Sequence, residues 1–438
     1  MQPRLHRILA DYGMVIVLLM LCAAFSGLTL EEQPATGPAA AARLATTLRQ
    51  ELAGRPRVLV AVRARPDEEA FAAAVTTALE AGGAEVVETV RGEPPAARAA
   101  LVRQAATGKR LDAIVCSQAA GSWLVFARIA EEFPSLGTPR VSLPAAFRWP
   151  NFLKRDNLLN IANQIAVIAI MAIGMTMVII AGGIDLSVGS LAALSAVVAT
   201  RLIRDAGGGV DATPGGMLLA CLAAIAVCGV VGAVSGLVIT RCGVPPFIVT
   251  LAMMLAASGL ASIIAEGESI YQIPGSFVWL GRGADFGLPN AVLLMLVLYG
   301  VAHVVMSRTR LGRYLYAVGG NREAARLSGV PVGRVLLLAY VASGLLAGLG
   351  GVLMASQLKS GSPTYGAMYE LYVIAAVVVG GTALAGGEGR VLGTLVGAFI
   401  IAVIQNGMNL MGIESYTQKV VLGSVILAAV LVDRLRHR

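Results

Sequence analysis

The sequence predicts an all-α polytopic membrane protein of about ten transmembrane helices, with an inserted extracytoplasmic α/β domain. The 438 residues are 57% hydrophobic and only 14% charged, and the mean hydropathy is +0.76. Soluble proteins contain about 25% charged residues, so the composition indicates a membrane protein. Apolar runs near the length that crosses a bilayer recur after residue 151, whereas residues 31–150 alternate strand-like and helical segments.

Charge and motifs exclude several classes of function. The formal net charge is +8, and the basic residues lie in short runs between apolar segments, which fits membrane orientation better than nucleic-acid binding. The five cysteines show no C-x-x-C spacing and the three histidines are scattered, so no disulfide framework, metal site or catalytic triad is indicated. No P-loop motif occurs, so this chain is not expected to hydrolyse ATP itself. We expect no catalytic residue and no bound cofactor.

Residues 1–30 begin with the basic sequence MQPRLHR and continue into the apolar run Gly13–Leu30. We interpret this run as the first transmembrane helix, and a cleaved signal peptide is the alternative. In either case the basic end stays in the cytoplasm and residue 31 emerges outside.

Residues 31–150 have the pattern of a domain with its own core. After a Pro/Ala-rich linker, strand-like runs alternate with helical ones, which predicts a parallel, doubly wound sheet. About 120 residues are enough to bury a core. The expected strands are residues 57–62, 84–90, 112–117 and 139–144, and the expected helices are Asp67–Gly82, Pro94–Gly108 and Ser122–Phe133.

In order, these segments, with GGAEVVET, DAIVCSQ and PRVSLP, resemble the N-terminal lobe of ribose-type periplasmic sugar-binding proteins. Only one lobe is present, so no interlobe cleft is expected. The turn ARPDEEAF has Phe71 as its only aromatic residue, and DAIVCSQAAG lacks the family's acidic and Asn side chains. Such contacts fix ligand orientation, so we interpret this domain as a docking or structural domain rather than a sugar receptor.

Residues 151–438 form the membrane domain. Counting from the first span, the third and eighth runs are short, so we expect either to be re-entrant or broken. Small residues at four-residue spacing, such as Gly232 with Gly236 and Gly344 with Gly348, are expected to pack helices closely. The candidate spans are Leu158–Ala181, Leu186–Ile203, Met217–Thr240, Pro246–Ala265, Pro289–Met306, Val335–Ser356, Leu371–Gly386, Leu392–Leu410 and Val420–Val432.

Positive charge gives the orientation. The loop 307–334 carries six arginines against the single acid Glu323, and the tail reads DRLRHR. Both segments are therefore expected in the cytoplasm, with both chain termini. Arg201 and Arg204 are an exception, because the count of spans puts them outside.

The stretch GMTMVIIAGGIDLSVGS interrupts its apolar run with Gly182, Gly183 and Asp185. Spacing alone favours a short cytoplasmic turn in which Asp185 caps the next helix. The other interpretation is a helix break whose acid faces protein or water inside the bundle. Gly380 and Gly381, in GGTALAGGEG, indicate a second break or tight turn, because no lysine follows that would suit a phosphate site.

Gln405, Asn406 and Asn409 share roughly one helix face. Together with Asp185 they are candidates for polar groups near a pathway or gate. An ordinary interhelical hydrogen bond, worth about 0.6 kcal/mol, is the slightly favoured alternative for these three residues.

The loop 307–334 contains a predicted short helix. Gly319 and Gly320 are expected to turn the chain, Asn321 to cap, and residues 322–328 to form a helix that stops at Gly329. Its mixture of small, apolar and charged residues suits docking into a groove on a partner. A plain charged loop that serves membrane orientation is the open alternative.

Five segments of residues 151–438 resemble ribose/xylose/arabinose/galactose-type ABC-importer permeases: GMTMVIIAGGIDLSVGSLAALSA, GVPPFIVTLAMMLAASGLA, LGRYLYAVGGNREAARLSGV, GGTALAGGEGRVLGTLVGA and QNGMNLMGI. The resemblance implies a homodimeric permease that forms the pathway for a monosaccharide, with a separate ATPase that uses ATP and a periplasmic sugar-binding protein. The α/β insertion departs from the usual family member. The residues that match the ATPase-coupling helix are Arg322, Glu323, Ala324, Ala325, Arg326, Leu327, Ser328 and Gly329.

An ion-coupled secondary transporter or channel for a small polar solute is the alternative function. It would be expected to contain several intramembrane acids or a histidine relay, and this chain offers only Asp185 and Glu370. The expected partners are therefore the ATPase, a second copy of this chain, the binding protein and the lipid bilayer, with no nucleic acid.

Overall fold

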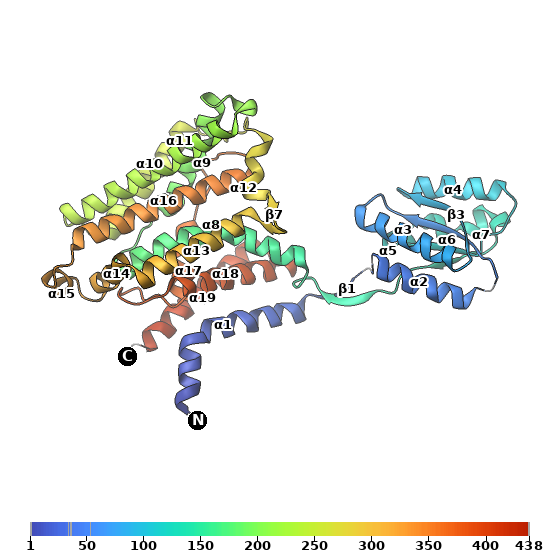
Figure 1. Cartoon of the computed structure of the whole chain (residues 1–438), viewed down its shortest axis with the longest axis horizontal. Helices are drawn as coiled ribbons and strands as arrows, with labels where there is room; N and C mark the ends of the chain where they lie inside the picture. The colour runs from blue at the N-terminus through green and yellow to red at the C-terminus, as the bar shows by residue number, and fades with distance from the viewer. Residues whose placement is uncertain (1, 34, 36, 53, 437–438) are drawn as a thin grey trace. The chain divides into compact units, whose positions relative to one another are not determined.

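The computed structural model describes residues 2–33, 35, 37–52 and 54–436, and it forms two compact units. One unit contains residues 1–29 and 151–438, here called the membrane unit, and the other, the α/β unit, is Leu30–Pro150. Figure 1 shows a bundle of helices in the first and a small sheet with flanking helices in the second.

The membrane unit is built from helices. Among the described residues, six of them are long and apolar enough to cross a bilayer: α8, α10, α11, α13, α16 and α18. The helices of this unit are α1 (Gln2–Leu28), α8 (Arg155–Ile180), α9 (Val188–Asp205), α10 (Pro214–Arg241), α11 (Pro246–Ile264), α12 (Trp279–Arg282), α13 (Asn290–Arg308), α14 (Arg310–Gly320), α15 (Arg322–Leu327), α16 (Val332–Leu358), α17 (Tyr369–Val379), α18 (Val391–Leu410) and α19 (Ser415–Arg436).

Helix α8 is the centre of this unit. It packs against α13, α16, α17 and α18 (Figure 1), and every residue from Ile165 to Ile180 is buried. A helix that is apolar on all sides belongs inside a bundle. At Gly174 an added Cβ would lie 2.7 Å from the Cα of Ser343, so the backbones of α8 and α16 touch there.

The expected close packing at glycine pairs is confirmed between α10 and α16. An added Cβ on Gly236 would lie 3.0 Å from the Cα of Leu337, and one on Gly348 would lie 3.0 Å from the Cα of Ile225. Because glycine has no Cβ, the two helices approach without lipid or side chains between them.

The eighth predicted span, Leu371–Gly386, is not one helix. Helix α17 ends at Val379, and its 11 residues rise about 16 Å, roughly half of a 30 Å hydrocarbon core. The preceding residues 359–368 are non-helical. They lie along α9, because Gly361 packs on Thr200 and Gly366 packs on Gly189.

The α/β unit contains a four-stranded sheet in the order β3-β2-β4-β5. All three pairings are parallel, as the alternation of strands and helices indicates. Val58, Val60 and Val62 pack against α2 and α3, whereas Leu59 and Ala61 face the opposite cluster with α4, because side chains alternate along a strand. The elements are α2 (Pro38–Glu51), β2 (Arg57–Val62), α3 (Pro66–Ala81), β3 (Glu85–Arg91), α4 (Pro94–Ala106), β4 (Ala113–Cys116) and β5 (Arg140–Ser142).

Two expectations for this unit are wrong. The supposed linker contains α2, whose buried Ala41, Leu44, Ala45 and Leu48 follow helical spacing. The expected helix Ser122–Phe133 is instead two short helices, α6 (Leu124–Ala127) and α7 (Ile129–Glu132), and a third, α5 (Gln118–Gly121), precedes it.

Two strand pairs were not predicted. Antiparallel strands β1 (Leu30–Gln33) and β6 (Phe147–Pro150) pair at the two ends of the α/β unit. In the membrane unit, β7 (Ala284–Asp285) and β8 (Leu288–Pro289) form a small hairpin before α13.

Candidate functional site

Asp185 lies inside the membrane unit, with only 1% of its surface exposed. Its Oδ1 accepts hydrogen bonds from the N–H (3.0 Å) and the hydroxyl (2.6 Å) of Ser187. Its Oδ2 accepts one from the hydroxyl of Ser343 on α16, at 2.8 Å. The carboxylate therefore joins the α8–α9 connection to a distant helix.

The interpretation of Asp185 as the cap of the next helix is wrong. Ser187 occupies the position before α9, and no side chain caps the first turn of that helix. Helix α8 itself ends at a glycine, because Gly182 has a φ of +78° and the N–H groups of Gly182 and Gly183 bond back to Ile179 and Val178. The chain is thus broken between two helices, and the acid is held within the break.

A matching end occurs at the second glycine pair. Gly381 has a φ of +85°, and the N–H groups of Gly381 and Thr382 bond back to the carbonyls of Val378 (2.9 Å) and Val377 (3.1 Å). Gly380 packs on Thr394 of α18, where an added Cβ would lie 2.7 Å from the Cα. Helices α8 and α17 therefore end in the same hydrogen-bonding pattern.

Five glycines join the end of α8 to α14 and to the loop before α18. An added Cβ on Gly319 would overlap the carbonyl oxygen of Ile180, and one on Gly387 would lie 2.8 Å from the Cα of Gly320. The N–H of Gly387 also donates to Ile180 at 2.8 Å. We call this contact the glycine junction, and its members are Gly182, Gly319, Gly320, Gly386 and Gly387.

Helix α14 leads directly from the glycine junction into α15. The expected turn at Gly319 and Gly320 is wrong, because α14 continues to Gly320. At Gly319 the close approach to α8 leaves no room for a side chain. The chain turns instead at Asn321, whose Oδ1 accepts a hydrogen bond from the N–H of Ala324 at 2.9 Å. The prediction that Asn321 caps is thereby confirmed.

Helix α15 is short and presents most of its residues to the surroundings. Ala325 is buried, at 5% exposed, while Leu327 is 81% exposed. Arg326 pairs with Glu323 at 2.9 Å. An exposed leucine among charged residues, on a helix fixed by one buried alanine, suits a protein-docking surface.

The exception to the positive-inside pattern has a structural explanation. Arg201 pairs with Asp205 (2.5 Å) and Glu266 (3.1 Å), and Arg204 pairs with Asp205 (2.7 Å). These two arginines are therefore locally neutralised.

Gln405, Asn406 and Asn409 do not lie near Asp185. Asn406 exchanges two hydrogen bonds with Asn157 near the start of α8, at 3.0 and 2.9 Å, and Asn157 lies about 35 Å along α8 from its end at Ile180. Asn409 accepts a hydrogen bond from Gln418 of α19 at 2.7 Å, and Gln405 is half-buried. The structure therefore gives Asn406 and Asn409 interhelical bonds.

Glu370, which was not among the predicted pathway residues, lies in the first turn of α17. Its carboxylate lies against Gly189 of α9, so that an added Cβ there would overlap Oε2. Its only signal in the sequence was an acid within an apolar run.

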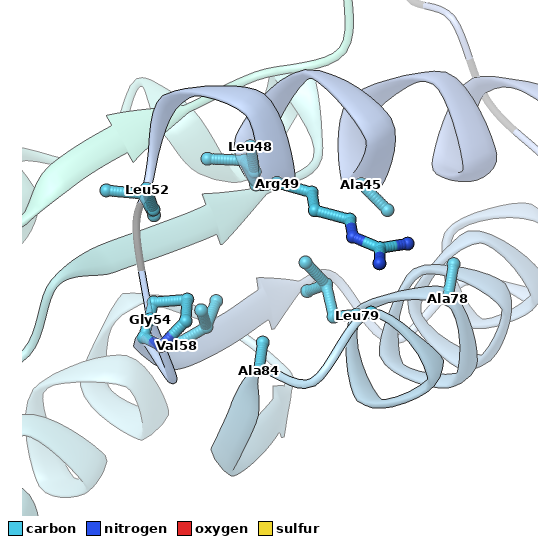
Figure 2. A pocket seen from close by; sticks show the side chains of 11 residues that line it. Ala45, Leu48, Arg49, Leu52, Gly54, Val58, Ala78, Leu79 and Ala84 are labelled. Carbon is cyan, nitrogen blue, oxygen red and sulfur yellow. The ribbon is translucent and has the colours of Figure 1, made fainter.

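The α/β unit has a small cavity between α2 and α3 (Figure 2). Its volume is about 30 Å³, which is room for one or two water molecules. Ala45, Leu48, Arg49, Leu79 and Gly82 are among the residues that line it. This cavity is too small to hold a sugar.

Six long apolar helices among the described residues, two interrupted spans and a short exposed helix are features typical of membrane transport proteins. Residues 157–430 match the model of the family described as branched-chain amino acid transport system / permease component. The chain belongs to this family of permease components. It is therefore a multi-pass transport component and not an enzyme.

Relatives named as sugar permeases match about two thirds of the chain. The ribose import permease of Escherichia coli strain K12 is 45% identical over 288 residues, which are 65% of this chain and 87% of that protein. The ribose import permease of Bacillus subtilis strain 168 is 43% identical over 287 residues, with the same coverages of 65% and 87%. The D-allose transport permease of E. coli K12 is 36% identical over 284 residues, 65% of this chain and 85% of that protein. No solved structure matches the chain.

Proposed function

We propose that this chain is the membrane-spanning permease subunit of an ATP-driven ABC importer for a ribose-like monosaccharide, in a bacterial inner membrane. The observation that carries the proposal is the 45% identity over 288 residues with a ribose import permease. The names of the relatives specify ribose or allose, which favours a sugar over the amino acids in the family's description.

Helix α15 and its two flanking residues, Ser328 and Gly329, are the proposed contact with a separate ATPase. ATP is used by that partner, and this chain binds no cofactor. A movement of α15 would reach α8 through α14, because the glycine junction leaves no side chains between α14 and the end of α8. ATP binding can then shift the equilibrium between permease conformations only if α15 makes different contacts with the ATP-bound and ATP-free states of the ATPase.

The proposed assembly is a homodimer of this chain with two ATPases. Loop 307–334 and both termini lie in the cytoplasm, which follows from the arginine-rich loop. The α/β unit then lies outside the cytoplasm, as an inserted domain that resembles one lobe of a sugar-binding protein. It serves as a docking or structural domain, with a periplasmic sugar-binding protein as a further partner, and about ten segments enter the bilayer.

The test is uptake of labelled D-ribose by cells that express the chain with its ATPase. Changing the P-loop lysine of the ATPase should abolish uptake, and Arg322→Ala with Arg326→Ala should uncouple uptake without reducing membrane insertion. The matched control is Arg308→Ala with Arg310→Ala, in the same loop but before α15. Uptake that survives loss of the ATPase and stops with a protonophore would instead establish the ion-coupled carrier.

A further inference from the structure

Two broken spans meet inside the membrane unit. Helix α9 begins at Val188 and α17 begins at Tyr369, and their first turns touch at Gly189, where an added Cβ would overlap Gly366 and Glu370. From this place α9 runs toward the end of α16, where Gly361 packs on Thr200, and the 11-residue α17 runs toward the start of α18, where Gly380 packs on Thr394. Transporters place binding sites at breaks of this kind, since freed backbone groups need protein or water around them.

The meeting point lies well within the bundle. Asp185, four residues before Gly189, bonds to Ser343, which is 11 residues after the first residue of α16 and 15 before its last, Leu358. At about 1.5 Å per residue, this is roughly 16 Å from one end of that helix and 22 Å from the other. Both acids, Asp185 and Glu370, are therefore near the middle of the membrane unit.

A cavity of about 230 Å³ opens beside this meeting point. Pockets for drug-sized ligands occupy about 300–1,000 Å³, so this one fits a smaller solute. Its lining combines α9, α11 and the non-helical segment before α17. It includes Ser190, Met254, Ser258, Tyr365 and Glu370.

The carboxylates of Asp185 and Glu370 differ in the hydrogen bonds that they accept. Both oxygens of Asp185 accept hydrogen bonds from serine groups. Glu370 lines the cavity, and within the described part of the chain no other side chain donates a hydrogen bond to it. Asp185 therefore holds the structure together, whereas the carboxylate of Glu370 can accept hydrogen bonds from a solute in the cavity.

We propose that this cavity is a binding site on the transport pathway for a neutral, polyhydroxylated solute, with Glu370 accepting hydrogen bonds from its hydroxyl groups. Ser190 and Ser258 supply hydroxyls that both donate and accept. A carboxylate repels anions, which disfavours sugar phosphates and the carboxyl end of an amino acid. This inference rests on the proposed function and narrows it, because it names the residue that selects the solute.

The test uses the full chain with Ser258→Cys and a cationic, membrane-impermeant methanethiosulfonate, and mass spectrometry follows labelling at position 258. The reagent should label this position, and D-ribose should slow the labelling while L-leucine should not. Adding Glu370→Gln should raise the ribose concentration needed for half-protection roughly tenfold, since a charge-assisted hydrogen bond becomes a neutral one. Glu414→Gln makes the same change at an exposed site and should leave protection unchanged.

Ser262→Cys, one turn further along α11, is the control for reagent access, and ribose should not alter its labelling rate. The inference is overturned if the cysteine at position 258 does not react with the reagent. It is also overturned if ribose does not slow the labelling of this cysteine while ribose uptake is intact. If ribose uptake is absent but another neutral polyol protects position 258 in a Glu370-dependent way, the cavity stands and the proposed ribose transport fails. If the cysteine variants do not fold, the test is the KM for uptake by the single variants Glu370→Gln and Glu414→Gln, without the added cysteines. The KM should rise for Glu370→Gln and not for Glu414→Gln, and equal KM values for the two variants overturn the inference.

Discussion

The hydroxyl of Ser343 donates a hydrogen bond of 2.8 Å to the carboxylate of Asp185, although 158 positions separate them in the sequence. Both side chains are buried, at 0% and 1% exposed. This bond links the break between α8 and α9 to the helix that follows α15. It therefore connects the interior of the bundle to the segment with which we propose the ATPase interacts.

Ser343→Ala should destabilise the protein by about 1–3 kcal/mol, because Asp185 would lose a donor in a place that water does not reach. Thermal unfolding of the purified chain measures this. The matched control is Ser424→Ala on α19, an exposed serine that bonds only to its own helix at 2.9 Å. An unchanged midpoint for Ser343→Ala would show that the bond contributes nothing.

Alanine substitutions at two neighbouring residues of the glycine junction, Gly319 and Gly320, test the contact between α14 and α8. At Gly319 an added methyl group would overlap Ile180 and approach Gly387, whereas Gly320 has nothing within 4 Å of such a group. Gly319→Ala should cost about 1–3 kcal/mol of stability from overpacking, and it should impair uptake by separating α14 from α8. Gly320→Ala should leave both properties close to wild type, and equal effects of the two changes would contradict the close contact.

The pair Asn157 and Asn406 tests whether these amides are structural. Asn406→Ala should lower stability by about 0.6–1.7 kcal/mol, the range for interhelical hydrogen bonds in membranes. The KM for sugar uptake should not change, because Asn406 is about 35 Å from the end of α8. A raised KM with unchanged stability would instead return Asn406 to the transport pathway.

Cys116, in the middle of the α/β unit's sheet, should report unfolding of that unit. Burial raises the pKa of its thiol from 9.0 to about 12, and the side chain is 0% exposed. Alkylation at pH 8 should therefore modify the exposed Cys242 and spare Cys116 until denaturant is added, as peptide mass spectrometry can show.

The same shift predicts a dependence on alkaline pH. Because the folded pKa lies above the unfolded one, the unfolded state loses its proton first as pH rises. The contribution of this thiol to the stability of the α/β unit is therefore constant below about pH 9 and is lost progressively between pH 9.0 and about 12. Cys116→Ala should remove this component of the alkaline loss.

Local patterns predicted much of the fold. The length of the apolar runs indicated the six long helices, and strand-helix alternation indicated the parallel sheet. Asn321 was predicted to cap from its position alone, because a cap involves only residues a few positions apart. Helix α2 was missed although its spacing was visible, since its proline and alanines were interpreted as a linker.

The sequence by itself determined that the chain enters a membrane, because apolar length and composition are properties of single segments. It also determined where the helices break, since Gly182 and Gly381 end helices through bonds to their own preceding turns. Only the tertiary structure decided which residues lie against these helix breaks and what role the two acids have there. Asp185 is a bridge because Ser343 reaches it, and Glu370 lines a cavity because α17 begins beside Gly189. Such pairings join residues more than 150 positions apart, and no local periodicity encodes them.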